Sequence, residues 1–148
     1  MKAPFLIGRL LFGGFFLYNG INHFKNRGQM AQYAASKGVP KADAAIVATG
    51  ALLAFGGASI ITGILPKLGT PAIAAFLGGV SPVMHNFWQA ENDGERMNQM
   101  VHFSKNAALL GADLVLMSLP EPWSMSLPIA QPSRLERVKK FARRNIAA

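Results

Sequence analysis

The chain has 148 residues, of which 51% are hydrophobic and only 15% are charged. It contains no cysteine, which excludes disulfides, thiol redox chemistry and iron–sulfur or thiolate-zinc sites within this sequence. The formal net charge is +8, and much of the excess lies in a C-terminal stretch that follows apolar segments. We therefore expect contact with anionic lipid headgroups and no binding of nucleic acid.

Four apolar segments predict an all-α membrane protein built as a four-transmembrane-helix bundle. A helix needs about 20 apolar residues to cross the hydrocarbon core of a bilayer. The first three segments are residues 4–24, 44–65 and 68–88. The fourth ends at residue 119 and reaches this length only if its helix begins near residue 97. An interfacial helix is the alternative for this fourth segment.

Small residues form stripes on two of these segments. Gly50, Ala54 and Ala58 recur at every fourth position of the second segment, and Ala74 and Gly78 do so on the third. Lipid provides no hydrophobic force that presses helices together, so membrane helices associate through small residues that let their backbones approach. The stripes therefore predict closely packed helices.

Two shorter helices are predicted outside the apolar segments. Residues 29–37 are expected to form a short interfacial helix in the first connection, ended by Gly38 and Pro40. Residues 1–120 then form the four-helix domain, and residues 121–148 form a proline-punctuated linker and a basic cytoplasmic tail. Within the tail, the capping-box residues Ser133 and Glu136 begin a predicted basic amphipathic helix.

The orientation in the membrane follows from the distribution of basic residues. Four spans place both termini on one side, and that side carries Lys2, Lys67 and the basic tail. Because basic residues favour the cytoplasm, both termini are predicted to be cytoplasmic. The first segment is expected to be retained as a helix, since Arg9 interrupts it and no small-residue cleavage site follows.

Polar residues inside the apolar segments gather at the membrane face opposite the termini. Alternating helices bring the ends of the first and third segments and the starts of the second and fourth to this face. Polar groups at membrane depth are costly and mark function or an internal pair, although each one could instead sit in the interface. The candidate binding site, which we call the polar cluster, consists of Asn19, Asn22, His23, His85, Trp88, His102, Lys105 and Asn106, with Thr49 at the same face.

Two charged residues lie near the other face. Arg9 and Asp113 are each about five residues from that end of their segments, so at about 1.5 Å per residue they have similar depth. We predict that they form a buried structural ion pair, which relieves the cost of each charge. Haem is not expected beside the three histidines because four short helices leave little room for a porphyrin. No metal site is expected, since no carboxylate lies at ligand spacing within a segment.

Several short motifs recur along the apolar segments and their connections. They are residues 8–13, 19–24, 33–34, 37–40, 49–50, 85–88 and 103–106, with Gly111. In their order and spacing these motifs resemble the DoxX family, and the resemblance covers residues 8–119. It implies a four-helix protein of the bacterial inner membrane with a link to oxidoreductases. Some relatives are subunits of a thiosulfate:quinone oxidoreductase, and others belong to membrane oxidoreductase complexes that handle oxidative stress and thiols.

Three functions remain open at this point. The first is a membrane subunit or adaptor of a soluble or membrane oxidoreductase, which holds a quinone headgroup at the polar cluster and is not catalytic alone. The second is a small-molecule carrier or channel that acts as a homo-oligomer. The third is a purely structural subunit of a membrane complex. All three functions place the chain in the lipid bilayer.

Overall fold

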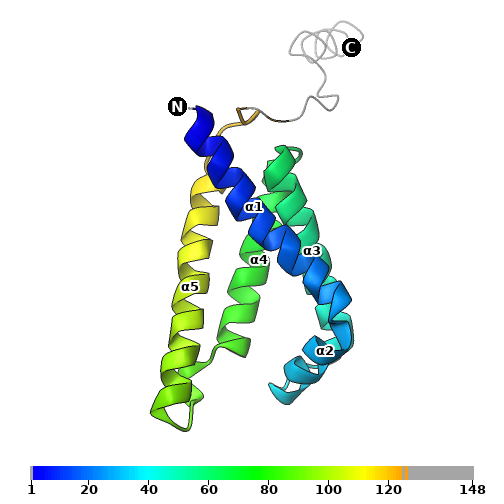
Figure 1. Ribbon diagram of the computed structural model, residues 1–148, viewed down its shortest axis with the longest axis vertical. Helices are drawn as coiled ribbons and strands as arrows, with labels where there is room; N and C mark the ends of the chain where they lie inside the picture. Colours follow the sequence, from blue (N-terminus) through cyan, green and yellow to red (C-terminus); the bar gives the residue numbers. More distant parts are fainter. Residues whose placement is uncertain (1, 125, 127–148) are drawn as a thin grey trace, which may run out of the picture.

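The computed structural model describes residues 2–124 and 126, and this part of the chain is helical (Figure 1). The helices α1, α3, α4 and α5 run in alternating directions, so the start of α1 and the end of α5 lie at one end of the molecule. The other end holds α2 and the connection between α4 and α5. The elements are α1 (Lys2–Lys25), α2 (Arg27–Ser36), α3 (Ala42–Thr62), α4 (Pro66–Met84), the short 3-10 helix η1 (Phe87–Gln89) and α5 (Asp93–Met117).

Two of these helices are long and apolar enough to cross a membrane. They are α1, over residues 3–25, and α3, over residues 42–62. Large hydrophobic side chains such as Leu11 and Tyr18 are exposed on the outer face of α1. The all-α prediction is confirmed, and so is the short helix of the first connection. The predicted basic helix of the tail lies outside the described residues.

The third predicted segment differs from α4 at both ends. The predicted segment begins at residue 68, whereas α4 begins at Pro66, after a turn formed by Gly63 and Leu65 in left-handed conformations. At the other end α4 stops at Met84, where residues 68–88 were expected to be helical. Pro82 lacks an amide hydrogen and crowds the preceding turn, so the helix ends soon after it.

Glycines bring α1 and α3 into close contact. A Cβ atom on Gly57 would lie 2.6 Å from the carbonyl oxygen of Gly13, and one on Gly20 would lie 2.9 Å from the Cα of Ala54. The predicted stripe is therefore correct at Gly50 and Ala54, but the close contact continues through Gly57. The stripe on the third segment is not an interface at Gly78, because a Cβ there would meet nothing within 4 Å.

A small hydrophobic core joins α1, α3 and α4. It contains Phe16 of α1, Leu53 and Ile60 of α3, and Ile73 and Leu77 of α4, all at most 2% exposed. Gly56 lets α4 approach α3, since a Cβ there would lie 2.9 Å from the carbonyl oxygen of Gly69. This core holds three of the helices that surround the cavity described below.

Arg9 is fully buried and caps the end of α3. Its Nε donates to the carbonyl oxygen of Ile60 at 2.9 Å, and its Nη2 donates to that of Ile61 at 2.9 Å. Its Nη1 donates to the carbonyl oxygen of Ser124, beyond α5, at 2.8 Å. The last carbonyl groups of a helix lack partners within the helix and carry partial negative charge, which makes them good acceptors for a guanidinium group.

The segment after α5 packs onto the bundle through Trp123, which the sequence did not predict. Trp123 is only 5% exposed and belongs to the hydrophobic core. Its ring contacts Phe5 edge to face, with 5.8 Å between centroids, and lies 5.4 Å from the guanidinium carbon of Arg9. A cation over an aromatic face is attracted to it, so Trp123 and Arg9 stabilise each other.

The structure does not form the predicted ion pair between Arg9 and Asp113. Both side chains are buried as expected, but the guanidinium of Arg9 binds three backbone carbonyls. Neither carboxyl oxygen of Asp113 has a hydrogen-bond partner among the described residues. The sequence could place both residues at one depth, but it could not reveal that the open end of α3 supplies better-placed acceptors.

We expect Arg9→Gln to be far more damaging than Asp113→Asn. Loss of the guanidinium leaves buried carbonyls without donors, which costs about 3 kcal/mol and lowers the melting temperature by roughly 10 °C. Asp113→Asn should change it by less than about 2 °C, because no partner is lost. Circular-dichroism melts of the purified variants in detergent measure both. Equal losses in the two variants would instead support the ion pair.

Candidate functional site

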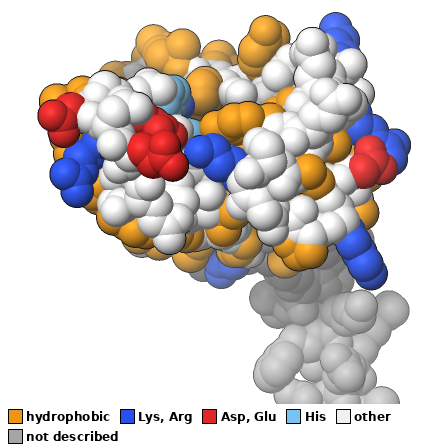
Figure 2. Space-filling model, turned by 90° about the horizontal axis from the view of Figure 1, so that it is seen from below, with side chains coloured by type: hydrophobic (Ala, Val, Ile, Leu, Met, Phe, Trp, Pro, Cys, Tyr) orange, Lys and Arg blue, Asp and Glu red, His pale blue; other side chains and the backbone are white. Residues whose placement is uncertain are grey.

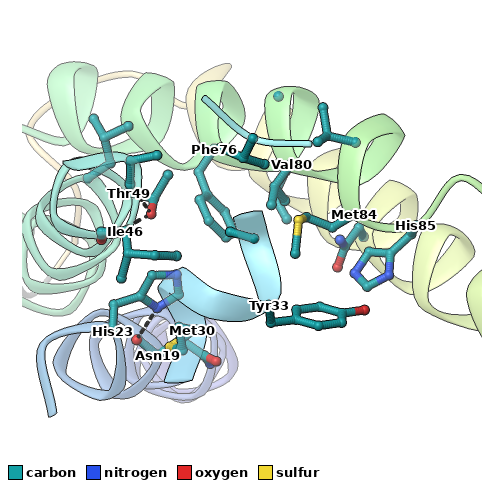
Figure 3. Close-up of a pocket in the computed structure, with 18 of the residues that line it drawn as sticks. Asn19, His23, Met30, Tyr33, Ile46, Thr49, Phe76, Val80, Met84 and His85 are labelled. Carbon is teal, nitrogen blue, oxygen red and sulfur yellow. Dashed lines mark hydrogen bonds between the residues drawn. The ribbon is translucent and has the colours of Figure 1, made fainter. Parts of the chain in front are cut away.

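A cavity of about 560 Å³ lies among the helices, toward the end of the molecule that holds α2. All five α-helices contribute side chains to it, and most of these side chains are apolar. Figure 2 views this end and shows hydrophobic side chains exposed between acidic and basic ones. Figure 3 shows that side chains from several helices point toward a shared interior space.

His23 forms the polar part of the wall contributed by α1. Its Nδ1 lies 2.8 Å from the carbonyl oxygen of Asn19, one helical turn earlier. The ring is 7% exposed, and its edge meets the ring of Phe76 with 6.0 Å between centroids. Gly50 makes room for it, since a Cβ there would lie 2.9 Å from the Cβ of His23.

A second polar group lies where the end of α4 meets α5. The Nδ1 of His85 lies 2.9 Å from the Oε1 of Gln99, a buried residue of α5. The rings of His85 and His102 are stacked, with centroids 5.0 Å apart. Lys105 can donate from Nζ to the Nδ1 of His102 at 3.5 Å. Both His85 and Lys105 line the cavity, so its wall includes an imidazole and a cation.

The neutral polar side chains of the lining include Asn19, Gln29, Thr49 and Asn106. Asn19 donates from Nδ2 to the carbonyl oxygen of Phe15 at 2.7 Å, and Thr49 donates its hydroxyl hydrogen to the carbonyl oxygen of Ala45 at 2.8 Å. Asn106 is 7% exposed, and no side-chain hydrogen bond joins it to another described residue. Its amide is therefore available to a bound molecule.

Helix α2 supplies a wall that the sequence analysis assigned only to the membrane surface. Met30, Tyr33 and Ala34 of this helix line the cavity, and Figure 3 shows Met30 and Tyr33 beside it. These residues fall on one helical face, and that spacing was the available signal. The other apolar wall residues that the sequence did not single out include Phe76, Val80 and Met84 of α4.

The structure brings part of the polar cluster together at the cavity: Asn19, His23, His85, Lys105 and Asn106. The others lie elsewhere. Asn22 accepts a hydrogen bond from Asn26 at 2.6 Å, and Trp88 packs against Phe103 beside a second cavity of about 260 Å³. His102 stacks behind His85 and is not part of the cavity lining.

Two ion pairs, one exposed and one half-buried, tie α2 and its connection to neighbouring helices. Lys37 lies 3.8 Å from Glu95 of α5, and Arg27 donates from Nε to Asp43 of α3 at 2.6 Å. The hydrogen bond to Asp43 raises the pKa of Arg27 above its ordinary value. Ion pairs near the surface add little stability. These two nevertheless link α2 to α3 and the connection after α2 to α5.

An apolar chamber with a few convergent polar groups is the usual form of a small-molecule site. Within residues 2–124 and 126, no group of three or more histidine, aspartate or glutamate side chains lies close enough together to hold a metal ion. The structure is thus that of an all-α protein with two candidate membrane spans and an apolar chamber that carries a few polar groups.

The family model described as DoxX matches residues 5–86. The chain therefore belongs to the DoxX family, as its motifs predicted, and it is a membrane protein of that family. The match covers the helices from α1 to α4, whereas Lys105 and Asn106 of α5 lie beyond it. No curated protein and no solved structure matches the chain.

Proposed function

We propose that this DoxX-family protein is a four-span protein of the bacterial inner membrane that binds a quinone-like molecule in its cavity. In this role it acts as a membrane subunit or adaptor of an oxidoreductase complex. The observation that carries the proposal is the cavity itself, which combines an apolar chamber with polar groups on α1 and at the junction of α4 and α5.

The chemistry of the lining suits a flat ring with oxygen atoms at its edge. The aromatic and aliphatic side chains of Phe76, Val80 and Met84 can cover the faces of such a ring. The ammonium group of Lys105 and the amide of Asn106 can donate to ring oxygens. Histidine and lysine also suit the reduced ring, whose hydroxyl groups are acidic enough to use a nearby base or cation.

The helix lengths support the four-span arrangement. α4 has 19 residues and α5 has 25, and at about 1.5 Å per residue both approach or exceed a hydrocarbon core of about 30 Å. α5 exposes Val101, Leu114 and Val115, which suits contact with lipid. The alternating helix directions put the start of α1 and the end of α5 on one side, and the basic residues of that side favour a cytoplasmic location.

In the proposed complex the redox chemistry belongs to the partner, and this chain holds the ligand. The cavity supplies binding groups, whereas a soluble or membrane oxidoreductase supplies or removes electrons. The basic tail is proposed to bind anionic lipid headgroups on the same side as the termini. An assembly of several copies acting as a carrier is the competing function.

Purification of the protein from its own membranes in mild detergent tests this proposal. Mass spectrometry of the purified material should find a quinone and a stoichiometric oxidoreductase. His85→Ala should retain about one tenth of the ligand, counted as quinone and hydroquinone together, because one hydrogen-bonding wall group is lost. Asn22→Ala is the matched control, since Asn22 bonds Asn26 and does not line the cavity. A homo-oligomer that carries neither quinone nor oxidoreductase would favour the carrier.

A further inference from the structure

We infer that the cavity selects the reduced form of its ring ligand, a hydroquinone or related phenol, over the oxidised quinone, and that His23 recognises the ring hydroxyl. The inference rests on the proposed function, because it takes a quinone-like ring to be the occupant. It adds which redox form binds and which side chain makes the distinction.

The hydrogen bonding of His23 fixes which of its ring nitrogens carries the hydrogen. A backbone carbonyl can only accept, so the 2.8 Å contact to the carbonyl oxygen of Asn19 requires a hydrogen on Nδ1. In the neutral imidazole, Nε2 is then left with a lone pair. The ring projects into the cavity beside Phe76, so this lone pair is available to a bound molecule (Figure 3).

Neighbouring groups on α1 and α3 present acceptors as well. The hydroxyl hydrogen of Thr49 is shared between the carbonyl oxygens of Ala45 and Ile46, at 2.8 and 3.2 Å, which leaves its oxygen to accept. Asn19 uses Nδ2 for the carbonyl oxygen of Phe15, and its Oδ1 is also an acceptor. This side of the cavity is therefore matched to a ligand that donates.

The second histidine repeats the arrangement on another wall. The Nδ1 of His85 meets the Oε1 of Gln99 at 2.9 Å, and a carbonyl-type oxygen again requires the hydrogen on Nδ1. Its Nε2 is then an acceptor too. Lys105 and Asn106 on α5 can donate a hydrogen bond to a ring oxygen of either redox form, so they do not discriminate between the two forms.

A hydroquinone and its quinone differ in whether their ring oxygens can donate a hydrogen bond to these acceptors. Hydroquinone hydroxyls donate, whereas quinone carbonyls only accept and would face the lone pairs of His23 and Thr49. A ligand that leaves buried polar groups unpaired loses at least about tenfold in affinity. We therefore expect the hydroquinone to bind at least about tenfold more tightly than the quinone.

Three probes with the same ring size and the same decyl tail test the inference. They are a decyl-substituted hydroquinone, the corresponding quinone, and the hydroquinone dimethyl ether, which has no hydroxyl. Their dissociation constants are measured on the full chain in detergent, without oxygen, near pH 8, where an ordinary imidazole is neutral. His23→Gln is the test variant, because its amide can both accept and donate. Asn22→Gln is the matched control, because Asn22 precedes His23 on α1 and lies outside the cavity lining.

The expected result is that wild type and Asn22→Gln prefer the hydroquinone at least about tenfold over both other probes, and that this preference is at least about threefold smaller in His23→Gln. The part that remains belongs to the acceptors of Thr49 and His85. Equal binding of the three probes to wild type would overturn the inference and leave the proposed function standing. A preference of unchanged size in His23→Gln would overturn the role of His23. Failure of wild type to bind any probe would remove the proposed function, and the inference with it.

Discussion

Gly57→Ala is expected to prevent stable packing of α1 against α3. The added Cβ would lie 2.6 Å from the carbonyl oxygen of Gly13 and would also collide with the backbone of Leu17. Backbone atoms cannot rotate away as a side chain can, so the two helices would have to separate along their contact. Overpacking of this kind costs about 3 kcal/mol or more, and the melting temperature should fall by at least roughly 10 °C.

Gly14→Ala is the matched control for this variant. Gly14 lies next to Gly13 on α1, and a Cβ there would meet nothing within 4 Å. Replacing glycine by alanine within a helix is favourable in itself, so this control should melt at the same temperature or slightly higher. The measurement is thermal unfolding in detergent. A Gly57→Ala protein as stable as Gly14→Ala would show that the close contact of α1 and α3 does not hold the bundle together.

Much of the helical architecture could be predicted from the sequence because the apolar segments and their breaks are local signals. The helix of residues 29–37 was marked by Gly38 and Pro40 and is present as α2. The end of α4 was missed because Pro82 acts within an otherwise apolar stretch, whose composition favoured a longer helix. Pro66 stands in the first turn of α4, where proline is tolerated, so the helix begins two residues before the predicted segment.

Contacts between distant parts of the chain were beyond the sequence. Arg9 was predicted to be buried near Asp113, and both are buried, but Arg9 binds carbonyl groups of α3 and of Ser124. Backbone carbonyls have no signature in a sequence, so only a charged partner could be proposed. Trp123 was missed for a related reason, because it follows prolines in a segment interpreted as a linker.

The candidate site was predicted in part. Alternating helix directions correctly indicated that residues from α1, α4 and α5 meet at one end, and His23, His85 and Lys105 do line one cavity. Depth in the membrane does not tell which side of a helix a residue occupies. Asn22 was therefore grouped with the residues of the cavity, although it bonds Asn26 and lies outside the cavity lining. The wall formed by α2 was missed because an apolar helical face suits membrane and cavity equally.

Gly79→Leu is expected to block the cavity without disturbing the fold. Gly79 lines the cavity and a Cβ on it meets nothing within 4 Å, so a leucine side chain can extend into the open space that the ligand needs. Gly78 provides a matched control. It is equally free of neighbours but lines the second, smaller cavity. Both substitutions remove a glycine from α4, so both should raise helix stability to a similar extent.

The central claim is that the larger cavity is the binding site for a quinone-like ring, and ligand affinity in these two variants tests it most directly. Dissociation constants for the decyl hydroquinone are measured on wild type, Gly79→Leu and Gly78→Leu in the same detergent. The proposed site requires Gly79→Leu to bind at least about tenfold more weakly, and Gly78→Leu to remain within about twofold of wild type. Unchanged affinity in Gly79→Leu, with the protein folded, would contradict the claim.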